Sequence, residues 1–380
     1  REFSPGRIDK EREDNGIMVK VLVIDDSALM RRQISQMLTE GDFEVVTARN
    51  GVEGLRLLAE ENPAVVTLDV NMPEMDGLTV LSHIMTENPK PVVMVSSLTE
   101  QGSLATLEAL ELGAVDFVHK PDGTVSHRLE QVQDEIIAKV RSAAKARISR
   151  ARGLRSRVAA VRQSMARPTS LPVATVESMG EDYPIIVIGV STGGPGALEE
   201  VLVGLPADFG APIVIAQHMP ENFTGVFARR LNDMCQLEVI EVRSPQVLQP
   251  GQVYIGKGDA DLVFVSRAGK PAVAVLPAAE HLLWHPNVDR MVESACKVVS
   301  PQRLIGVQLT GMGYDGAEQM AKLRQLGGQT IAESEETAVV FGMPAELIKR
   351  GGATMVLPCD RIGRQLIDWV ARARRATVKR

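Results

Sequence analysis

Three short stretches in the second half of the chain contain the residue types that a hydrolytic serine site requires. Residues 189–193 match G-x-S-x-G, a sharp turn that presents a serine as a nucleophile, and they place Ser191 among glycines. His218 and Asp315 each follow a different apolar run. A histidine can accept the proton of a serine hydroxyl, and an aspartate can fix the tautomer of that histidine and stabilise its charged form. The three stretches therefore predict the nucleophile, base and acid of an acyl-transfer reaction.

Three predicted strands must bring these side chains together. Residues 185–189, 211–216 and 304–309 are short apolar runs, each followed by one of these polar stretches and then by a helical pattern. Because parallel strands place their carboxyl ends at one edge of a sheet, we expect the three side chains to converge there. Further strands are predicted at residues 329–332 and 354–357, and antiparallel strands within the Gly-, Pro- and Val-rich region 237–276.

The chain has six histidines, and two of them compete with His218 for the role of the base. His281 and His285 flank Trp284 ahead of a predicted helix start. In α/β-hydrolases the histidine follows the acid in the chain, but both competitors precede Asp315 and neither ends a convincing central strand. His218 is the preferred base because it lies at the same predicted edge as the serine and the aspartate.

The same turns offer donors for an oxyanion, but they also suggest a phosphate-binding loop. Thr192, the amides of residues 193–194 and the glycine-framed amide of Met312 are candidate donors, and a helix beginning near Pro195 adds a favourable dipole. A Rossmann-type phosphate loop is the alternative interpretation. Its G-x-G-x-x-G spacing does not match here, and no acidic residue stands at the strand end about twenty residues on, where a ribose contact is required.

The first part of the chain contains a second group of chemically capable residues. Five predicted strands alternate with helical patterns, which is typical of a doubly wound parallel sheet with helices on both faces. Polar residues follow these strands at their carboxyl ends, namely Asp25, Asp26, Asp69, Ser96 and Lys120. The strands are predicted at Val19–Ile24 and at residues 44–47, 65–68, 91–95 and 115–118.

These strand-end residues have the chemistry of a phosphorylation site. Three carboxylates gathered at one edge repel one another unless a hard cation neutralises them, and Mg²⁺, which prefers oxygen ligands, suits such a site. A lysine and a hydroxyl at the same edge can hold the oxygens of a phosphoryl group. Any one of these residues could be an ordinary solvated loop residue. That alternative does not explain why all of them follow matching strand ends.

Composition and charge narrow the class of protein. The chain of 380 residues has a formal net charge of −6, which argues against a dedicated nucleic-acid binder, and its length favours two or three domains. No apolar run approaches the roughly 18 residues that span a bilayer, so direct membrane insertion is not expected. Three widely spaced cysteines without C-x-x-C fit reduced thiols, which predicts a cytoplasmic location.

Two segments are predicted to lie outside the packed domains. Residues 1–17 are polar without an apolar period and are expected to form a disordered extension. Residues 139–167 hold ten Lys or Arg residues and no acidic ones. This composition favours a basic flexible linker over residues 141–183. A nucleic-acid patch is the alternative, but no aromatics are interleaved with the basic residues and no helix-turn-helix follows.

Three segments in the first part of the chain read Val-Ile-Asp-Asp-Ser, Leu-Asp-Val-Asn-Met-Pro-Glu-Met-Asp-Gly and Asp-Phe-Val-His-Lys-Pro. On these segments residues 18–124 resemble a response-regulator receiver domain. The resemblance implies a flavodoxin-like fold, a histidine kinase as phosphodonor and Asp69 as the phospho-acceptor. It implies that Asp26 and Asp69 bind Mg²⁺ with support from Asp25. The switch residues that it implies are Ser96, Phe117 and Lys120.

Five segments in the second half read Ile-Gly-Val-Ser-Thr-Gly-Gly-Pro, Gln-His-Met-Pro, His-Pro-Asn-Val-Asp, Leu-Thr-Gly-Met-Gly-Tyr-Asp-Gly-Ala and Val-Val-Phe-Gly-Met-Pro. On these segments residues 184–375 resemble the catalytic domain of chemotaxis protein-glutamate methylesterases, in which a receiver also precedes the enzyme. The resemblance implies a Rossmann-like α/β domain with Ser191, His218 and Asp315 as its triad. The oxyanion groups that it implies are Thr192 and the amide of Met312.

The resemblance also implies a substrate that residue chemistry alone does not indicate. Methyl-esterified glutamates on the cytoplasmic helices of chemoreceptors would be hydrolysed with release of methanol, and receptor glutamines would be deamidated through the same acyl-enzyme route. No cofactor is expected for the esterase. Tyr314 and Glu333 depart from the family pattern, and a tyrosine and an extra carboxylate near the site are expected to affect substrate preference.

The sequence thus predicts two doubly wound α/β domains, a receiver at residues 18–140 and a methylesterase domain at residues 184–375. The predicted protein is a phosphorylation-activated serine hydrolase in which the unphosphorylated receiver covers the active-site edge. Phosphorylation of Asp69 would repack the receiver and open the site. Two alternatives are a response regulator whose second domain only binds a nucleotide or a partner, and a DNA-binding regulator that uses the basic linker.

Overall fold

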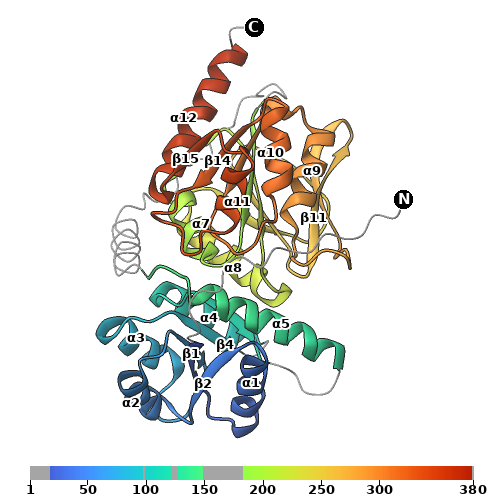
Figure 1. Ribbon diagram of the computed structural model, residues 1–380. Coiled ribbons are helices and arrows are strands. Elements are labelled where there is room, and N and C mark those ends of the chain that lie inside the picture. Colours follow the sequence, from blue (N-terminus) through green and yellow to red (C-terminus); the bar gives the residue numbers. More distant parts are fainter. Residues whose placement is uncertain (1–17, 97–98, 121–125, 149–182, 379–380) are drawn as a thin grey trace.

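The computed structural model describes residues 18–96, 99–120, 126–148 and 183–378, which form two α/β units (Figure 1). In the first unit five parallel strands lie in the order β2-β1-β3-β4-β5, which confirms the predicted doubly wound sheet. Its strands are β1 Val19–Ile24, β2 Phe43–Ala48, β3 Val65–Asp69, β4 Val92–Ser96 and β5 Asp116–His119. Its helices are α1 Ala28–Glu40, α2 Gly51–Glu61, α3 Gly77–Glu87, α4 Glu100–Leu112 and α5 Ser126–Ala143.

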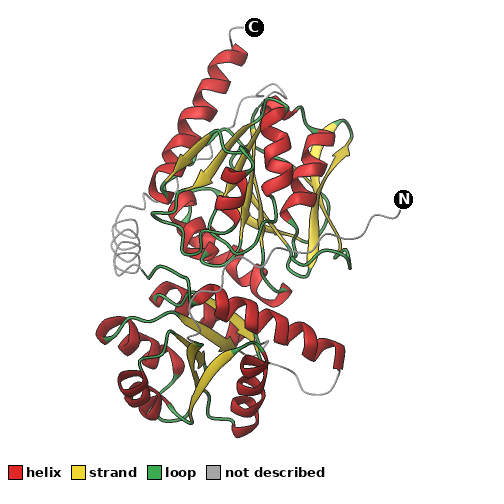
Figure 2. Ribbon diagram, in the orientation of Figure 1, coloured by secondary structure: helices red, strands yellow, loops and turns green. Residues whose placement is uncertain are grey.

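The second unit is built on a seven-stranded parallel sheet in the order β15-β14-β13-β6-β7-β10-β8, with helices on both faces (Figure 2). Its strands are β6 Ile185–Val190, β7 Ile213–Gln217, β8 Glu238–Val242, β10 Gln252–Gly256, β13 Leu304–Gln308, β14 Gln329–Glu333 and β15 Met355–Leu357. Its helices are α7 Gly194–Leu202, α8 Glu221–Met234, α9 Val288–Val298, the 3-10 turn η1 Pro301–Arg303, α10 Ala317–Gln325, α11 Met343–Lys349 and α12 Cys359–Val378.

The region at residues 237–276 forms two different kinds of strand. β8 and β10 join the main sheet in parallel, with Val253 opposite Val239 on one side and Ile213 on the other. A separate antiparallel sheet has the order β11-β12-β9, made of β9 Gln246–Val247, β11 Ala260–Arg267 and β12 Lys270–Pro277. The predicted antiparallel strands are therefore confirmed for only part of this region, because an apolar pattern does not specify which strand is the partner.

Buried strands and capped helices explain why these elements form. β6 reads Ile-Ile-Val-Ile-Gly-Val and every residue of it is buried, as expected for a central parallel strand covered on both faces. Asn287 caps α9 by accepting a hydrogen bond from the amide of Arg290, and Asp76 caps α3 through the amide of Thr79. The caps satisfy amides that would otherwise lack partners at the helix ends.

The two units contact each other mainly through α4 of the first and α8 of the second (Figure 1). The rings of Phe117 and Phe223 lie 4.3 Å apart between their centroids. The guanidinium of Arg230 on α8 forms ion pairs with Glu111 of α4 and Glu199 of α7, so one side chain bridges both units. The interface therefore combines an aromatic contact with a charged one.

The chain that follows the first unit is partly packed. α5 extends to Ala143, which is fully buried, so this helix overlaps the start of the range predicted as the linker. Arg147 then contacts the second unit, where its amide donates to the carbonyl of Val339 at 3.2 Å and its guanidinium pairs with Glu335 at 2.7 Å. The remaining predicted linker at residues 149–182 and the predicted extension at residues 1–17 lie outside the described residues.

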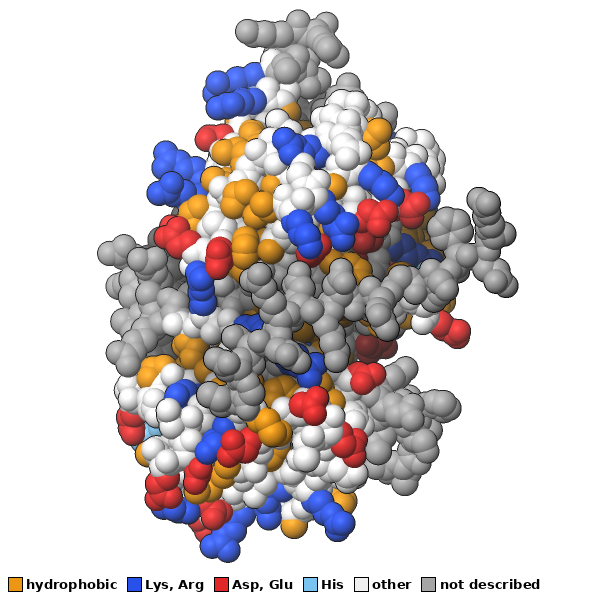
Figure 3. Space-filling model, viewed as in Figure 1, with side chains coloured by type: hydrophobic (Ala, Val, Ile, Leu, Met, Phe, Trp, Pro, Cys, Tyr) orange, Lys and Arg blue, Asp and Glu red, His pale blue; other side chains and the backbone are white. Residues whose placement is uncertain are grey.

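Figure 3 shows acidic and basic side chains interspersed over one face of both units. On this face the described residues gather no continuous basic surface of the kind that neutralises nucleic-acid phosphates. Within the described ranges, no helix combines the length and the apolar character needed to cross a membrane.

Gly189 in β6 lies where there is no room for a side chain. A Cβ at this position would lie 2.4 Å from Cγ1 of Val288 on α9. Gly189→Ala should therefore lower the free energy of unfolding by about 1–3 kcal/mol, as in other overpacked cores, measured by urea denaturation. Gly196→Ala is the matched control, because a Cβ there meets no heavy atom within 4 Å and alanine favours the helix. Unchanged stability of Gly189→Ala would contradict this packing.

Candidate functional site

Strand pairing places Ser191 and His218 side by side. β6 and β7 are parallel neighbours, with Val190 opposite Gln217, so the next residue of each strand leaves the sheet at the same edge. The amide of His218 donates to the carbonyl of Val190 at 3.1 Å. The side-chain amide of Gln217 donates to the carbonyls of Ser191 and His218, at 3.1 and 3.0 Å. One glutamine thus ties the serine turn to the histidine turn.

Thr310 holds the serine turn from the neighbouring strand end. Its carbonyl accepts the amide of Ser191 at 3.0 Å, and its hydroxyl donates to the carbonyl of Thr192 at 2.9 Å. The amide of Thr310 donates to Oε2 of Glu333 at 2.8 Å. Glu333 is fully buried and its other oxygen accepts the hydroxyl of Thr337, so this carboxylate supports the turn. Contrary to expectation, Glu333 does not present a carboxylate to a substrate.

The peptide between Gly311 and Met312 is oriented by the start of α11. The carbonyl of Gly311 accepts the amides of Gly342 and Met343 at 3.1 and 2.8 Å. In a trans peptide the N–H points away from the C=O, so the amide of Met312 points away from α11. A Cβ on Gly311 would lie 2.7 Å from Cβ of Ser191, so this turn also touches the serine. This orientation is compatible with the predicted role of the Met312 amide as an oxyanion donor.

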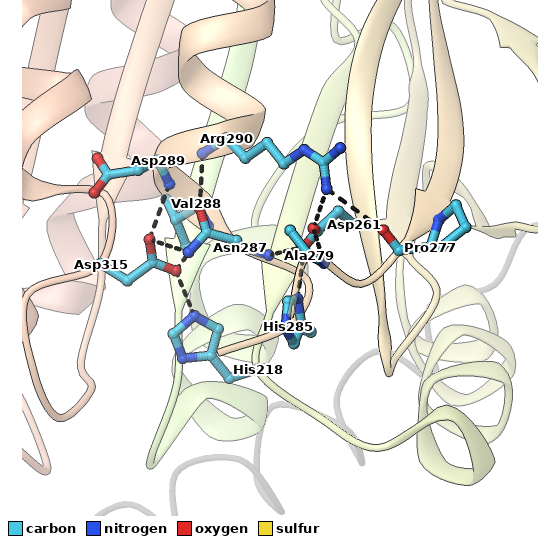
Figure 4. A network of polar contacts seen from close by, with 10 residues as sticks. All are labelled: His218, Asp261, Pro277, Ala279, His285, Asn287, Val288, Asp289, Arg290 and Asp315. Carbon is cyan, nitrogen blue, oxygen red and sulfur yellow. Dashed lines mark hydrogen bonds and ion pairs between the residues drawn. The ribbon is translucent and has the colours of Figure 1, made fainter. Parts of the chain in front are cut away.

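Asp315 is a buried carboxylate held at the start of α9 (Figure 4). Its Oδ2 lies 2.8 Å from Nε2 of His218 and accepts the amide of Val288 at 2.7 Å. Its Oδ1 accepts the side-chain amide of Asn287 and the backbone amide of Asp289, each at 2.9 Å. Because the first amides of a helix are unpaired and carry partial positive charge, they are suited to bind an anion. The helix start therefore holds Asp315 as the acceptor for the histidine.

The contact with Asp315 assigns the roles of the two ring nitrogens of His218. A carboxylate only accepts, so Nε2 of His218 carries the proton and Nδ1 carries the lone pair. Nδ1 is buried, and among the described residues it has no hydrogen-bond partner. The imidazole therefore keeps an unpaired basic nitrogen, and its residue follows the strand next to that of Ser191. This arrangement can accept a proton from a hydroxyl and share the resulting charge with Asp315.

The two competing histidines have different surroundings. His281 is exposed, and Nδ1 of His285 lies 2.8 Å from the buried carboxylate of Asp261. Neither follows a strand of the main sheet. His218 instead has Trp284 stacked on its ring, with 5.9 Å between centroids and an interplanar angle of 7°. The structure therefore supports the choice of His218 as the base.

Aromatic side chains form one wall of this site. The edge of Tyr314 meets the face of Trp284, with ring centroids 5.3 Å apart. Tyr314 is 52% exposed, so it lies at the outer rim of the wall, where it can contact a substrate. A Cβ on Gly313, which has φ +82°, would lie 2.8 Å from the Trp284 ring. The tryptophan therefore packs against both the histidine and the turn that carries the predicted oxyanion amide.

In the first unit the strand ends bring three carboxylates together. Ligand oxygens of Asp25, Asp26 and Asp69 lie within 4.8 Å of one another. The ammonium of Lys120 lies 2.7 Å from Oδ2 of Asp69 and 3.1 Å from Oδ2 of Asp25. Burial raises the pKa of Asp69 to about 6, with the charge of Asp25 adding to the rise and Lys120 opposing it. Oxygen-only ligands and a surplus of negative charge fit a hard divalent cation such as Mg²⁺.

The predicted switch residues lie around this cluster and toward the second unit. Ser96 is buried at the end of β4, and its hydroxyl donates to the carbonyl of Gly102 in α4 at 3.2 Å. Phe117 is buried against Phe223 of the second unit. The structure therefore places Lys120 beside Asp69, the predicted phospho-acceptor, and directs Ser96 toward α4.

The first unit also contacts the serine turn directly. Oδ2 of Asp116 in β5 accepts the hydroxyl of Thr192 at 2.5 Å, so a predicted oxyanion donor is engaged by the other unit. Oδ1 of Asp116 accepts the amide of Phe117 at 2.8 Å and lies 3.4 Å from the ammonium of Lys139. This contact joins the edge that carries Ser191 to the strand that carries Phe117.

Sequence reasoning missed several residues that support the site, above all Asn287, Thr310 and Gln217. A helix-capping signal was present in Pro-Asn-Val-Asp, where Asn287 precedes the first turn of α9. That signal predicts a cap but not the second contact of the same side chain with Asp315. The roles of Thr310 and Gln217 depend on neighbouring strands and leave no local signal.

Two family models match the chain. The model described as response regulator receiver domain matches residues 21–129, and the model described as CheB methylesterase matches residues 186–366. The two matches fall on the two α/β units in the order in which they occur in the chain.

Curated relatives are similar over nearly the whole chain. Protein-glutamate methylesterase/protein-glutamine glutaminase 3 of Rhodospirillum rubrum is 56% identical over 365 residues, covering 94% of this chain and 98% of that protein. Protein-glutamate methylesterase/protein-glutamine glutaminase 2 of Rhodopseudomonas palustris is 49% identical over 359 residues, covering 93% of this chain and 98% of that protein. The solved CheB methylesterase catalytic domain of Thermotoga maritima shares 40% identity with a TM-score of 0.48, covering 49% of this chain and 98% of that chain.

Proposed function

The chain belongs to the family of CheB-type protein-glutamate methylesterases and glutaminases that carry a receiver domain, and on this premise we propose that Ser191, His218 and Asp315 perform its reaction. It is a response regulator of chemotaxis adaptation whose output is this enzyme. The observation that supports the three roles is the His218–Asp315 pair, which leaves Nδ1 of His218 without a hydrogen-bond partner among the described residues, on a turn next to that of Ser191. The substrate is a glutamate methyl ester, or a glutamine, on a chemoreceptor.

In the first half of the reaction Ser191 attacks the ester carbonyl carbon. Nδ1 of His218 takes the hydroxyl proton, and Asp315 stabilises the imidazolium through Nε2. The developing oxyanion accepts hydrogen bonds from the amide of Met312 and from Thr192. The tetrahedral intermediate then breaks its bond to the methoxy group, which takes the proton from His218 and leaves as methanol. The product is an acyl-enzyme on Ser191.

In the second half of the reaction, water hydrolyses the acyl-enzyme through the same proton transfers by His218. Nδ1 of His218 takes a proton from water, which attacks the acyl carbon, and the proton then returns to Ser191 as the glutamate carboxyl group leaves. With a glutamine substrate the first leaving group is ammonia, and the second half is identical. Since both substrates pass through one acyl-enzyme, the same residues serve both activities.

Ser191→Ala removes the nucleophile while leaving the rest of the site in place. Methanol release from methylated chemoreceptor should fall by up to about 10⁶-fold, as it does for other serine triads. Ser300→Ala, an exposed serine on the same domain, should retain wild-type turnover. A fluorophosphonate probe should label the wild type and not Ser191→Ala. Retention of most methanol release by Ser191→Ala would exclude this nucleophile, and failure of the probe to label the wild type would favour a binding module.

We further propose that a histidine kinase phosphorylates Asp69 with Mg²⁺ bound at the receiver carboxylates. Asp25, Asp26 and Asp69 would hold the ion, which when bound neutralises the carboxylates and the incoming phosphoryl oxygens. Oδ2 of Asp25 is buried and lies 3.1 Å from the ammonium of Lys120, so it already faces positive charge, which fits a carboxylate that supports a cation. Lys120 would pair with the phosphoryl group once it forms, as it now pairs with Asp69.

Asp26→Asn tests this assignment of the metal site. Removing one charged ligand should weaken Mg²⁺ binding at least about tenfold, measured by calorimetric titration of the full chain, because affinity for a hard cation follows ligand charge. Asp42→Asn, in the turn between α1 and β2, is the control and should bind Mg²⁺ as the wild type does. Equal affinity of Asp26→Asn and the wild type would exclude Asp26 as a ligand.

The unphosphorylated receiver is proposed to restrain the esterase through the contact of Asp116 with Thr192. A carboxylate 2.5 Å from this hydroxyl both occupies an oxyanion donor and places negative charge where the oxyanion would form. Asp116 is adjacent to Phe117, which packs on Phe223 of α8. A rearrangement of β5 after phosphorylation would therefore move Asp116 away from Thr192.

Asp116→Asn should raise the basal esterase activity of the unphosphorylated full chain. We expect methanol release without a phosphodonor to increase roughly tenfold, within the range usual for coupling between two sites. Asp134→Asn, on the exposed side of α5, is the matched control and should leave the basal rate unchanged. A basal rate of Asp116→Asn equal to that of the wild type would show that this contact does not restrain the enzyme.

A further inference from the structure

We propose that Asp261 is a positioning residue for the esterase. It anchors the loop at residues 279–290, which lies outside the main sheet and contacts both His218 and Asp315. The inference rests on the proposed catalytic roles of Ser191, His218 and Asp315, and it adds a residue that is not part of the triad. Asp261 belongs to β11 of the separate antiparallel sheet, so its link to the site crosses two sheets.

Asp261 is a charged residue that directly precedes the apolar residues 262–265 of β11, and its side chain is fully buried. Four donors converge on its two oxygens (Figure 4). Oδ1 accepts Nδ1–H of His285 at 2.8 Å and the amide of Asn287 at 3.0 Å. Oδ2 accepts the amide of Ala279 at 3.2 Å and the guanidinium of Arg290. All four donors belong to residues 279–290, so one carboxylate gathers this whole loop.

The donors keep Asp261 ionised in spite of its burial. Burial by itself would raise the pKa of Asp261, but hydrogen bonds from His285, Asn287 and Arg290 outweigh it and hold the pKa below its usual value. A buried anion whose lone pairs are all engaged is rigid, because releasing any donor leaves an uncompensated charge. The loop is therefore fixed relative to β11.

The same loop reaches the catalytic pair from two directions. At its end, Asn287 and the first amides of α9 bind the carboxylate of Asp315. In its middle, Trp284 stacks on the ring of His218 and packs against the turn at Gly313. Stacking of this kind restricts rotation of the imidazole, and a tryptophan face stabilises the imidazolium that forms during the reaction.

A carboxylate is required at position 261 because every neighbour is a donor. Asparagine has nearly the same shape, but its NH₂ group would face two N–H donors in place of an acceptor oxygen. The NH₂ group of the asparagine would then repel the N–H donors of the loop. Since a misplacement of about 1 Å in a catalytic group can cost about 100-fold in rate, loosening this loop should slow the chemical step.

Asp261→Asn in the full chain, activated with a small-molecule phosphodonor, is the first test. We expect kcat for methanol release to fall roughly 10- to 100-fold with KM nearly unchanged, because the change affects orientation of the base and acid and not substrate contacts. Labelling of Ser191 by a fluorophosphonate should slow by a similar factor. Asp259→Asn, two residues earlier and bonded only to the amide of Glu221 among the contacts described, should keep wild-type kcat and labelling.

A double-mutant cycle separates positioning from general loss of stability. In an Asn287→Ala background, Asp261→Asn should lower kcat by less than it does in the wild type, because the side-chain link from the loop to Oδ1 of Asp315 is already missing. A merely structural effect would give the same factor in both backgrounds and would appear as a lowered Tm without slower labelling of the folded fraction. Either of those results would overturn the proposal.

Arg290→Gln is the second variant should Asp261→Asn fail to fold. It removes one charged donor at the edge of the network and keeps the carboxylate, so kcat should fall by a smaller factor of about 3 to 10. Wild-type kcat in a folded Arg290→Gln, or in a folded Asp261→Asn, would exclude the anchoring role.

If Ser191→Ala abolishes methanol release while Asp261→Asn turns over normally, only this inference fails. If Ser191→Ala remains active, the proposed function fails independently of Asp261.

Discussion

The pairing of β13, β6 and β7 is the constraint on which the active site depends. These parallel strands run in register, with Gln308 opposite Gly189 and Val190 opposite Gln217, so three turns leave the sheet at neighbouring positions of one edge. The hydrogen bonds that join the turns to one another continue this register beyond the strands. Because the strands are buried on both faces, a shift of register would expose apolar side chains, and the burial of the sheet therefore fixes the catalytic geometry.

Buried carboxylates do most of the positioning around that edge, and each is surrounded by donors. Asp315 accepts hydrogen bonds from the first amides of α9. In return, Asp289 of α9 accepts the amide of Gln319 in α10, so each helix start is bound by a carboxylate from beside the other. Glu333 supports the serine turn from beneath, and Asp261 supports the loop outside. A buried charge is stable only when its lone pairs are engaged, so these groups define positions more sharply than apolar contacts do.

The receiver contacts the catalytic domain at the serine turn and at α8. Its strand β5 carries Asp116 and Phe117 in sequence, and these meet Thr192 and Phe223 across the interface. Arg230 adds an ion pair to each domain. Interfaces between domains rearrange readily, so these contacts suit the proposed control of the esterase by phosphorylation of the receiver.

The sequence alone was sufficient for the two α/β domains, the carboxylate cluster of the receiver and the placement of Ser191, His218 and Asp315 at one edge of the second sheet. Parallel strands bring their carboxyl ends to one edge, and these residues follow such ends. It could not specify that β8 and β10 extend the main sheet, since apolar patterns do not name a partner strand. Only the tertiary structure decided which nitrogen of His218 is basic, that Glu333 faces the interior, and that Asp261 anchors the loop at residues 279–290. Those properties arise from hydrogen bonds between residues far apart in the chain, and an aspartate beside an apolar run does not reveal its partners.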